Sequence, residues 1–166
     1  READADVAEA IDFLEFYARD MQRLVESPSL GQAPGEQNQV LYAPRGVTAV
    51  LAPWNFPLAI PTGMVGAALV TGNPVLFKPS ERSPRVGHLL VEVLAEAGLP
   101  NGVLQFVPGG PEVGRALVGH PEVRMIAFAG SKDVGLSILA RAVSVEPGRQ
   151  GLKHVIAEMG GKNAII

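Results

Sequence analysis

The chain of 166 residues is predicted to fold as an α/β domain with an open, mostly parallel sheet and helices on both faces. Three observations predict this class. Short apolar segments alternate with helical patterns, which is typical of βαβ units. The strand segments are continuously apolar, as expected where both faces of a sheet are covered. The 19 glycines and 14 prolines are scattered along the chain and form no tracts, which indicates many turns between short elements.

The first expected element is an amphipathic helix within the acidic residues 1–26. Apolar residues recur there at steps of four and three, which predicts one face that packs on the body of the protein. That face comprises Val7, Ile11, Leu14, Ala18, Met21 and Val25. Ser27-Pro28 is expected to end the helix, because the residue before a proline disfavours helical geometry. Pro28 to Asn38 is then expected to be an exposed loop.

From residue 46 onward, strands and helices are expected to alternate. Strands are predicted at 46–52, 75–77, 103–107, 125–129 and 155–157, and helices at 62–70, 84–97, 112–118 and 132–142. The segment 62–70 has small and apolar residues on all sides, which predicts a buried helix. The segment 84–97 has a single apolar face and should lie on the surface of the sheet.

The composition excludes several classes of protein. With 47% apolar and 19% charged residues, the chain can build a core and is not a disordered tail. The net charge of −3 gives no reason to expect a nucleic-acid partner. The longest apolar run, 58–70, is too short to span a membrane, and the charged opening residues do not resemble a secretory leader, so we expect a protein that is not secreted. There is no cysteine, and three separated histidines show no metal-ligand spacing, so no metal site is expected.

Candidate site residues follow the predicted strands. In parallel sheets ligands bind outside the carboxyl ends of the strands, so the residues at these ends are the ones to inspect. All five ends are polar or glycine-rich: Pro53-Trp54-Asn55, Lys78-Pro79-Ser80-Glu81, Pro108-Gly109-Gly110, Gly130-Ser131 and Glu158-Met159-Gly160-Gly161. The sequence therefore predicts a ligand site along one edge of the sheet.

Lys78 and Glu81 could hold the two hydroxyls of a ribose, with the acid accepting their protons and the ammonium donating. A carboxylate there would repel a 2′-phosphate, which favours NAD over NADP. The alternative is a surface ion pair.

The glycines from Gly109 to Gly114 and the pair Gly130-Ser131 each open a predicted helix, where backbone N–H groups can bind phosphate. The alternative for Ser131 is a helix cap. No G-x-G-x-x-G fingerprint occurs.

Two further residues have the chemistry of catalytic groups. Asn55, between Pro53 and Pro57, offers an amide donor in a stiff apolar turn, as the stabilisation of an oxyanion requires. The alternative is a turn residue that bonds its own backbone. Glu158 follows an apolar strand and could act as a general base or as a structural acid.

Together these residues resemble the aldehyde dehydrogenase superfamily, over essentially the whole chain. Five motifs occur in the family's order and spacing: Pro53-Trp54-Asn55-Phe56-Pro57, Gly72-Asn73-Pro74, Lys78-Pro79-Ser80-Glu81, Phe128-Ala129-Gly130-Ser131 and Glu158-Met159-Gly160-Gly161-Lys162. The resemblance implies a variant dinucleotide-binding fold without the usual glycine fingerprint. Ala129 stands where the family usually has a threonine, so that hydroxyl is absent.

The resemblance also implies roles for single residues. Asn55 would be the oxyanion donor and Glu158 the general base. Lys78 and Glu81 would hold the adenosine ribose of NAD, and Ser131 would contact the pyrophosphate. Further expected cofactor contacts are Ala52, Pro53, Trp54, Ser80, Gly109, Gly114, Phe128, Gly130 and Gly160.

Within the family, Lys132-Asp133-Val134-Gly135, the stretch from Glu146 to His154 and the acidic opening helix are similar to 1-pyrroline-5-carboxylate dehydrogenases. This similarity implies NAD-dependent oxidation of L-glutamate γ-semialdehyde to glutamate in proline catabolism. It implies a homo-oligomeric parent protein in the bacterial cytoplasm, or in the mitochondrial matrix of a eukaryote.

The family's nucleophile is a cysteine, which attacks the aldehyde before hydride transfer and lies downstream of the Glu158 motif. Because this chain has no cysteine, we expect it to be a fragment that is inactive alone. Its expected parts are a helix and connecting arm (1–45), an incomplete NAD-binding domain (46–157) and the start of the crossing into a missing catalytic domain (158–166).

Two other interpretations remain at this point. The chain could be a non-catalytic nucleotide-binding or assembly module. It could also be a relative that uses the same fold for acyl-phosphate reduction.

Overall fold

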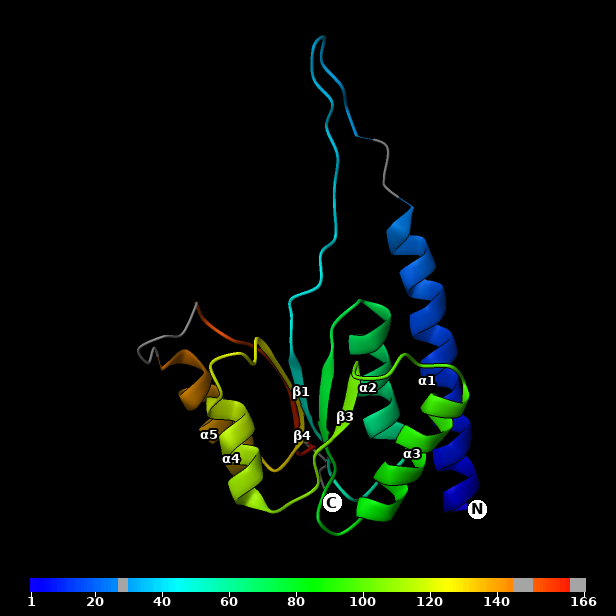
Figure 1. Ribbon diagram of the computed structural model, residues 1–166, viewed down its shortest axis with the longest axis vertical. Coiled ribbons are helices and arrows are strands. Elements are labelled where there is room, and N and C mark those ends of the chain that lie inside the picture. The colour runs from blue at the N-terminus through cyan, green and yellow to red at the C-terminus, as the bar shows by residue number, and fades with distance from the viewer. Residues whose placement is uncertain (27–29, 145–150, 162–166) are drawn as a thin grey trace, which may run out of the picture.

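The computed structural model describes residues 1–26, 30–144 and 151–161. In these residues a parallel sheet of five strands has the order β3-β2-β1-β4-β5 (Figure 1). The strands are β1 (Thr48–Leu51), β2 (Val75–Lys78), β3 (Leu104–Phe106), β4 (Met125–Gly130) and β5 (His154–Met159). The helices are α1 (Glu2–Val25), α2 (Ala59–Val70), α3 (Pro84–Glu96), α4 (Pro111–Gly119) and α5 (Lys132–Val143). The predicted fold class is confirmed, with element bounds within a few residues of those expected.

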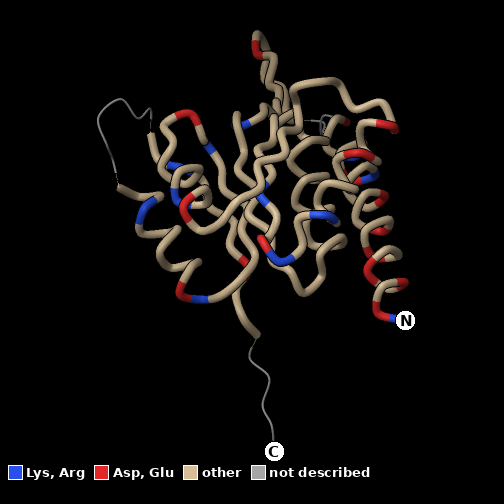
Figure 2. The backbone as a smooth tube through the Cα atoms, turned by 60° about the horizontal axis from the view of Figure 1, so that its bottom comes forward, with Lys and Arg blue, Asp and Glu red and all other residues tan. Residues whose placement is uncertain are grey.

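Helix α1 packs against α2 on the outside of the molecule, and its acidic residues are spaced along its length (Figure 2). The predicted packing face of α1 is wrong, because Val7 and Ile11 are exposed whereas Asp6 and Ala10 are buried. The buried face is offset by one residue, which corresponds to about 100° around the helix. The physical reason lies in α2, which offers backbone N–H groups and glycines to α1. Ser27 and Pro28, expected to end the helix, lie outside the described residues.

The arm between α1 and β1 extends away from the body of the protein (Figure 1), and residues 31–45 are exposed. Buried Asn73 holds the arm where it enters the sheet. Its Oδ1 accepts hydrogen bonds from the backbone N–H groups of Arg45 at 2.6 Å and Gly46 at 3.0 Å. Its Nδ2 donates to Thr71 Oγ1 at 2.9 Å. The entry of the chain into β1 therefore depends on a side chain from the turn before β2.

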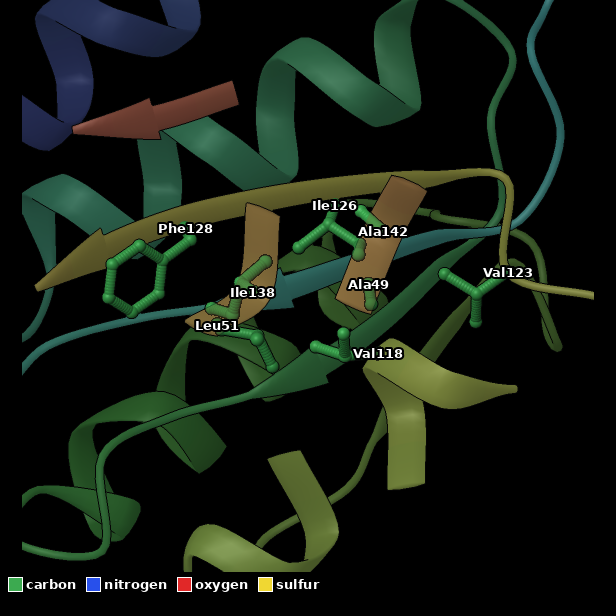
Figure 3. Packing of buried hydrophobic residues seen from close by; sticks show 8 residues of the cluster. All are labelled: Ala49, Leu51, Val118, Val123, Ile126, Phe128, Ile138 and Ala142. Atoms are coloured by element: carbon green, nitrogen blue, oxygen red, sulfur yellow. The ribbon is translucent and has the colours of Figure 1, made fainter. Parts of the chain in front are cut away.

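The sheet is covered on both faces. In β1, Ala49 and Leu51 point toward α4 and α5, where they join the apolar cluster shown in Figure 3. Val50 and Ala52 point the opposite way, into a second cluster built with α2 and α3. This alternation is expected for a strand with period two, and it makes β1 the central element of both clusters.

Strand β5 is covered on one face only. Val155, Ala157 and Met159 pack against the first cluster, whereas the side chains at the alternate positions, such as Ile156, are exposed. No helix in the described parts of the chain is long and apolar enough to cross a membrane. The described residues also contain no group of three or more side chains that could hold a metal ion.

Candidate functional site

The strand order creates a topological switch point beside β1. The chain runs from β1 through β2 to β3 on one side and then returns to β4 on the other. In register, Leu51 of β1 pairs with Lys78 of β2 and with Phe128 of β4. The residues that follow these three strands therefore meet at one edge of the sheet. Ligands of open α/β sheets bind at such a position.

The turn after β1 carries Asn55, whose side chain is exposed. Within the described parts of the chain, the Asn55 amide has no hydrogen-bond partner, so the turn does not consume its donor. The neighbouring Trp54 is 54% exposed. The guanidinium carbon of Arg82 lies 5.4 Å from the centroid of the Trp54 ring. This cation–π contact links the turn after β1 to the turn after β2.

Lys78 ends β2 and is half-buried beside α4. Its Nζ donates to the carbonyl of Pro79 at 3.1 Å, and its own carbonyl accepts from the backbone N–H of Ala52 at 3.1 Å. A Cβ added at Gly114 would lie 3.8 Å from Lys78 Cδ and Cε, which places the stem against the first half of α4. Burial lowers the pKa of Lys78, and the negative charge of Glu81 opposes this shift. The structure therefore holds an incompletely solvated cation beside an exposed carboxylate.

Ser80 lies in the turn between these two charged residues. Its Oγ accepts a hydrogen bond from the backbone N–H of Arg82 at 3.3 Å. The Ser80 hydroxyl thus shapes the turn that carries Glu81.

The glycines before α4 bring bare backbone to the same edge. Gly110 occupies the N-cap position of α4, and no side chain caps this helix there. The N–H of Gly110 donates to Glu112 Oε1 at 3.1 Å. A Cβ on Gly109 would come within 2.4 Å of Val113 Cγ2, so this position tolerates only glycine without rearrangement.

Helix α5 begins at the switch point. Ser131 occupies its N-cap position, but the Ser131 side chain makes no capping hydrogen bond. The capping alternative is therefore not what the structure shows. A Cβ on Gly130 would lie 2.7 Å from the ring of Phe128. The Phe128 side chain is 7% exposed and packs in the core, with its ring against Gly130. The first turn of α5 presents free N–H groups and a partial positive charge.

Glu158 lies inside β5 and not after it, since the strand is longer than expected. It stands opposite Ala129 of β4 in register, and its side chain is exposed. Gly160 follows the strand and is also exposed. Lys162 and the stretch from Glu146 to Gln150 lie outside the described residues.

Two residues with a role at this edge were missed by the sequence analysis. Arg82 contacts Trp54, and an arginine close after Glu81 was the available signal. Asp6 accepts hydrogen bonds from the start of α2, and a charged residue beside the apolar face of a helix gave only a weak signal.

The chemistry of this edge fits a dinucleotide. A cation and a carboxylate stand at the end of β2, where a ribose diol can be held. Helix α5 begins there after Ser131 with no side-chain cap, so its first N–H groups can bind a pyrophosphate, and helix α4 begins after Gly110. A side chain at Gly109 would clash with Val113, so the backbone before α4 stays bare at this edge.

The chain is similar to known proteins over its whole length. The model of the aldehyde dehydrogenase family matches residues 1–166. The 1-pyrroline-5-carboxylate dehydrogenase of Geobacillus thermodenitrificans is 56% identical over 167 residues, covering 100% of this chain and 32% of the relative. The 1-pyrroline-5-carboxylate dehydrogenase 2 of Bacillus subtilis is 53% identical over 166 residues, covering 99% of this chain and 32% of the relative. The chain thus spans about a third of the length of these curated relatives, 32% in both cases.

Solved structures are also similar to this chain. A 1-pyrroline-5-carboxylate dehydrogenase from Thermus with bound NAD has 47% identity and a TM-score of 0.93, covering 97% of this chain and 32% of that one. Proline utilization A from Bdellovibrio bacteriovorus has 52% identity and a TM-score of 0.93, covering 96% and 17%. The sheet and helices described above therefore have the same arrangement as in these solved structures.

Proposed function

Since this chain belongs to the aldehyde dehydrogenase family, we propose that it is the cofactor-binding part of a longer enzyme that oxidises L-glutamate γ-semialdehyde to glutamate with NAD. The relatives that cover the whole chain are named 1-pyrroline-5-carboxylate dehydrogenases, which supports this substrate. The observation that carries the proposal is the convergence of the ends of β1, β2 and β4 on one edge of the sheet.

Each part of this edge has a role in holding the cofactor. Glu81 accepts hydrogen bonds from the ribose hydroxyls, and Lys78 donates to the same group. The N-terminus of α5 and the hydroxyl of Ser131 bind the pyrophosphate, and Gly109 before α4 lies beside the adenine half. Bound NAD supplies the acceptor for the hydride of the substrate.

Two side chains act on the substrate. The Asn55 amide donates to the aldehyde oxygen as negative charge develops there, a contribution of about 3 kcal/mol to the transition state. The Glu158 carboxylate takes a proton from the hydrolytic water. The thiol nucleophile comes from the part of the protein outside this chain, because the chain has no cysteine.

The first experiment measures NADH formation by the longer protein with glutamate semialdehyde and NAD. We expect turnover by that protein and none by the 166-residue chain alone. Turnover by the isolated chain would refute the division of roles. Reduction of an acyl phosphate with NADPH, without aldehyde oxidation, would favour the related reductase.

The second experiment separates catalysis from cofactor binding. We expect Asn55→Ala to lower kcat by about 10²-fold to 10³-fold, because one oxyanion donor is lost. Calorimetric binding of NAD should be unchanged. An equal loss of NAD affinity would show that Asn55 holds the cofactor and not the oxyanion.

Glu81→Gln tests the choice of cofactor. The Glu81 carboxylate would repel the 2′-phosphate of NADP at a distance of about 4 Å. Its replacement by an uncharged amide is expected to shift the cofactor preference toward NADP on the order of tenfold. Glu122→Gln is the matched control, because Glu122 is exposed before β4 at the opposite edge of the sheet. Equal shifts in both variants would assign the effect to net charge.

We also propose that the longer protein is a homo-oligomer in the bacterial cytoplasm. Exposed apolar side chains support self-association, among them Leu41 and Tyr42 in the arm. Sedimentation of the longer protein tests this, and a monomer at micromolar concentration would contradict it.

A further inference from the structure

A carboxylate of the first helix is buried at the start of the second. Asp6 is 9% exposed. Its Oδ1 accepts a hydrogen bond from the backbone N–H of Ala59 at 2.8 Å, and its Oδ2 accepts one from Leu58 at 3.1 Å. The two donors lie 52 and 53 residues away from Asp6 in sequence. A long-range contact of this kind ties the position of α2 to that of α1.

These hydrogen bonds satisfy groups that α2 cannot satisfy itself. Leu58 occupies its N-cap position, and a leucine has no acceptor with which to cap a helix. Ala59 is fully buried, so water does not reach its N–H. The carboxylate of Asp6 takes the place of the missing cap, and its negative charge also suits the positive end of the helix. The contact is a charge-assisted one, stronger than a neutral hydrogen bond.

The capped residues directly follow the turn that carries Asn55. At the other end of this turn, the N–H of Ala52 donates to the carbonyl of Lys78 at 3.1 Å. Pro53 and Pro57 restrict the backbone between these two anchors. The turn is thus held by the sheet at one end and by Asp6 at the other.

We propose that Asp6 is a positioning residue for Asn55. By fixing the backbone at Leu58 and Ala59, the Asp6 carboxylate sets where the turn ends and hence where the Asn55 amide points. The catalytic part of this inference rests on the proposed function of Asn55. The structural part, an effect of Asp6 on the turn, does not.

Helix α1 has other contacts that hold it on α2. An added Cβ at Gly63 would lie 3.2 Å from the Phe13 ring, and one at Gly66 would lie 3.0 Å from Leu14 Cδ2. These close approaches are independent of the Asp6 carboxylate. Substitution of Asp6 is therefore expected to loosen the turn while α1 stays packed on α2.

The chain carries its own reporter of the turn. Trp54 is the single tryptophan of the sequence and precedes Asn55 directly. In folded Asp6→Ala, we expect a lower fluorescence anisotropy of Trp54 and faster amide hydrogen exchange at Ala59. Asp6→Asn keeps one acceptor oxygen and should lie between Asp6→Ala and the wild type, and it serves where the alanine variant folds poorly. Asp12→Ala, which removes an exposed acid from the same helix, should match the wild type.

Activity of the longer protein gives the second readout. Small misplacements of a catalytic group cost up to about 10²-fold in rate, so we expect Asp6→Ala to lower kcat on the order of tenfold. The KM for NAD should change less than kcat, because Lys78, Glu81 and Ser131 lie outside this turn and only the expected contacts at Ala52, Pro53 and Trp54 lie in it or beside it. Partial recovery of kcat in Asp6→Asn is expected as well.

The Trp54 measurement and the activity measurement test different parts of the inference. If Asp6→Ala only lowers the unfolding midpoint, with wild-type anisotropy of Trp54 and wild-type kcat in the folded protein, Asp6 is a structural cap and the inference is wrong. If the longer wild-type protein has no aldehyde activity, the proposed function is wrong while the Trp54 measurement still decides the effect on the turn.

Discussion

Replacement of Asn73 by alanine tests how the arm and β1 are joined. Asn73 is 4% exposed and lies in the turn between α2 and β2. The substitution removes an acceptor that serves the N–H groups of Arg45 and Gly46, and it removes the donor to Thr71 Oγ1. Since Gly46 lies two residues before β1, the change acts on the entry to the central strand.

The magnitude follows from these contacts. Each intramolecular hydrogen bond contributes about 1 kcal/mol net, and a buried group left without a partner costs about 1–3 kcal/mol. Arg45 is exposed, so water can replace its lost acceptor, whereas Gly46 is half-buried. We therefore expect Asn73→Ala to lower the free energy of unfolding by about 2–3 kcal/mol. Asn73→Asp keeps the acceptor for both N–H groups and should cost about 1 kcal/mol or less.

Urea unfolding of the chain, followed by circular dichroism and by Trp54 fluorescence, measures both variants. With a slope of about 2 kcal/mol per molar urea, the midpoint of the alanine variant should fall by about 1 M. Equal losses in the alanine and aspartate variants would refute the acceptor argument. A loss below about 1 kcal/mol in Asn73→Ala would show that the two N–H groups are hydrated in the native protein.

Three further predictions use the same unfolding assay. Burial lowers the pKa of Lys78 below its ordinary 10.5, so the unfolded chain binds this proton more tightly than the folded protein does. The free energy of unfolding should therefore rise with pH between the lowered pKa and 10.5. Lys78→Met should remove that rise, and an unchanged pH profile in this variant would contradict the prediction. The buried hydroxyl of Thr62 has no hydrogen-bond partner among the described residues, so Thr62→Val should be neutral or stabilising by about 1 kcal/mol, and a clear loss would mean that the hydroxyl is paired. A Cβ at Gly87 would lie 2.9 Å from Pro79 Cβ and 3.2 Å from Phe77 Cε1, so Gly87→Ala should lose about 1–3 kcal/mol from overpacking, offset by about 1 kcal/mol of helix propensity. A net gain in stability would contradict the last prediction.

Much of the site could be predicted without coordinates, because parallel strands bring their carboxyl ends to one edge. Lys78 and Ser131 are separated by more than fifty positions in sequence, yet Lys78 ends β2 and Ser131 follows β4, and both strands are neighbours of β1 in the sheet. Alternation of apolar strands with helices was enough to predict that edge. The roles of these residues toward cofactor and substrate stay predictions.

Other features depended on partners that no local pattern identifies. Glu158 was expected after its strand, but pairing with β4 extends β5 through Met159 and leaves the Glu158 side chain exposed. The contact of Arg82 with Trp54 joins two turns that only the sheet brings together.

The sequence by itself determined the class of fold, the order of the elements and the residues at the edge of the sheet, since apolar periodicity and turn residues are local properties. Tertiary structure alone decided which face of α1 is buried. Apolar periodicity predicted that the face of α1 with Val7 and Ile11 is buried, but in the structure the face with Asp6 is buried instead. The reason is physical: the uncapped N–H groups at the start of α2 require an acceptor, and a carboxylate of α1 satisfies them.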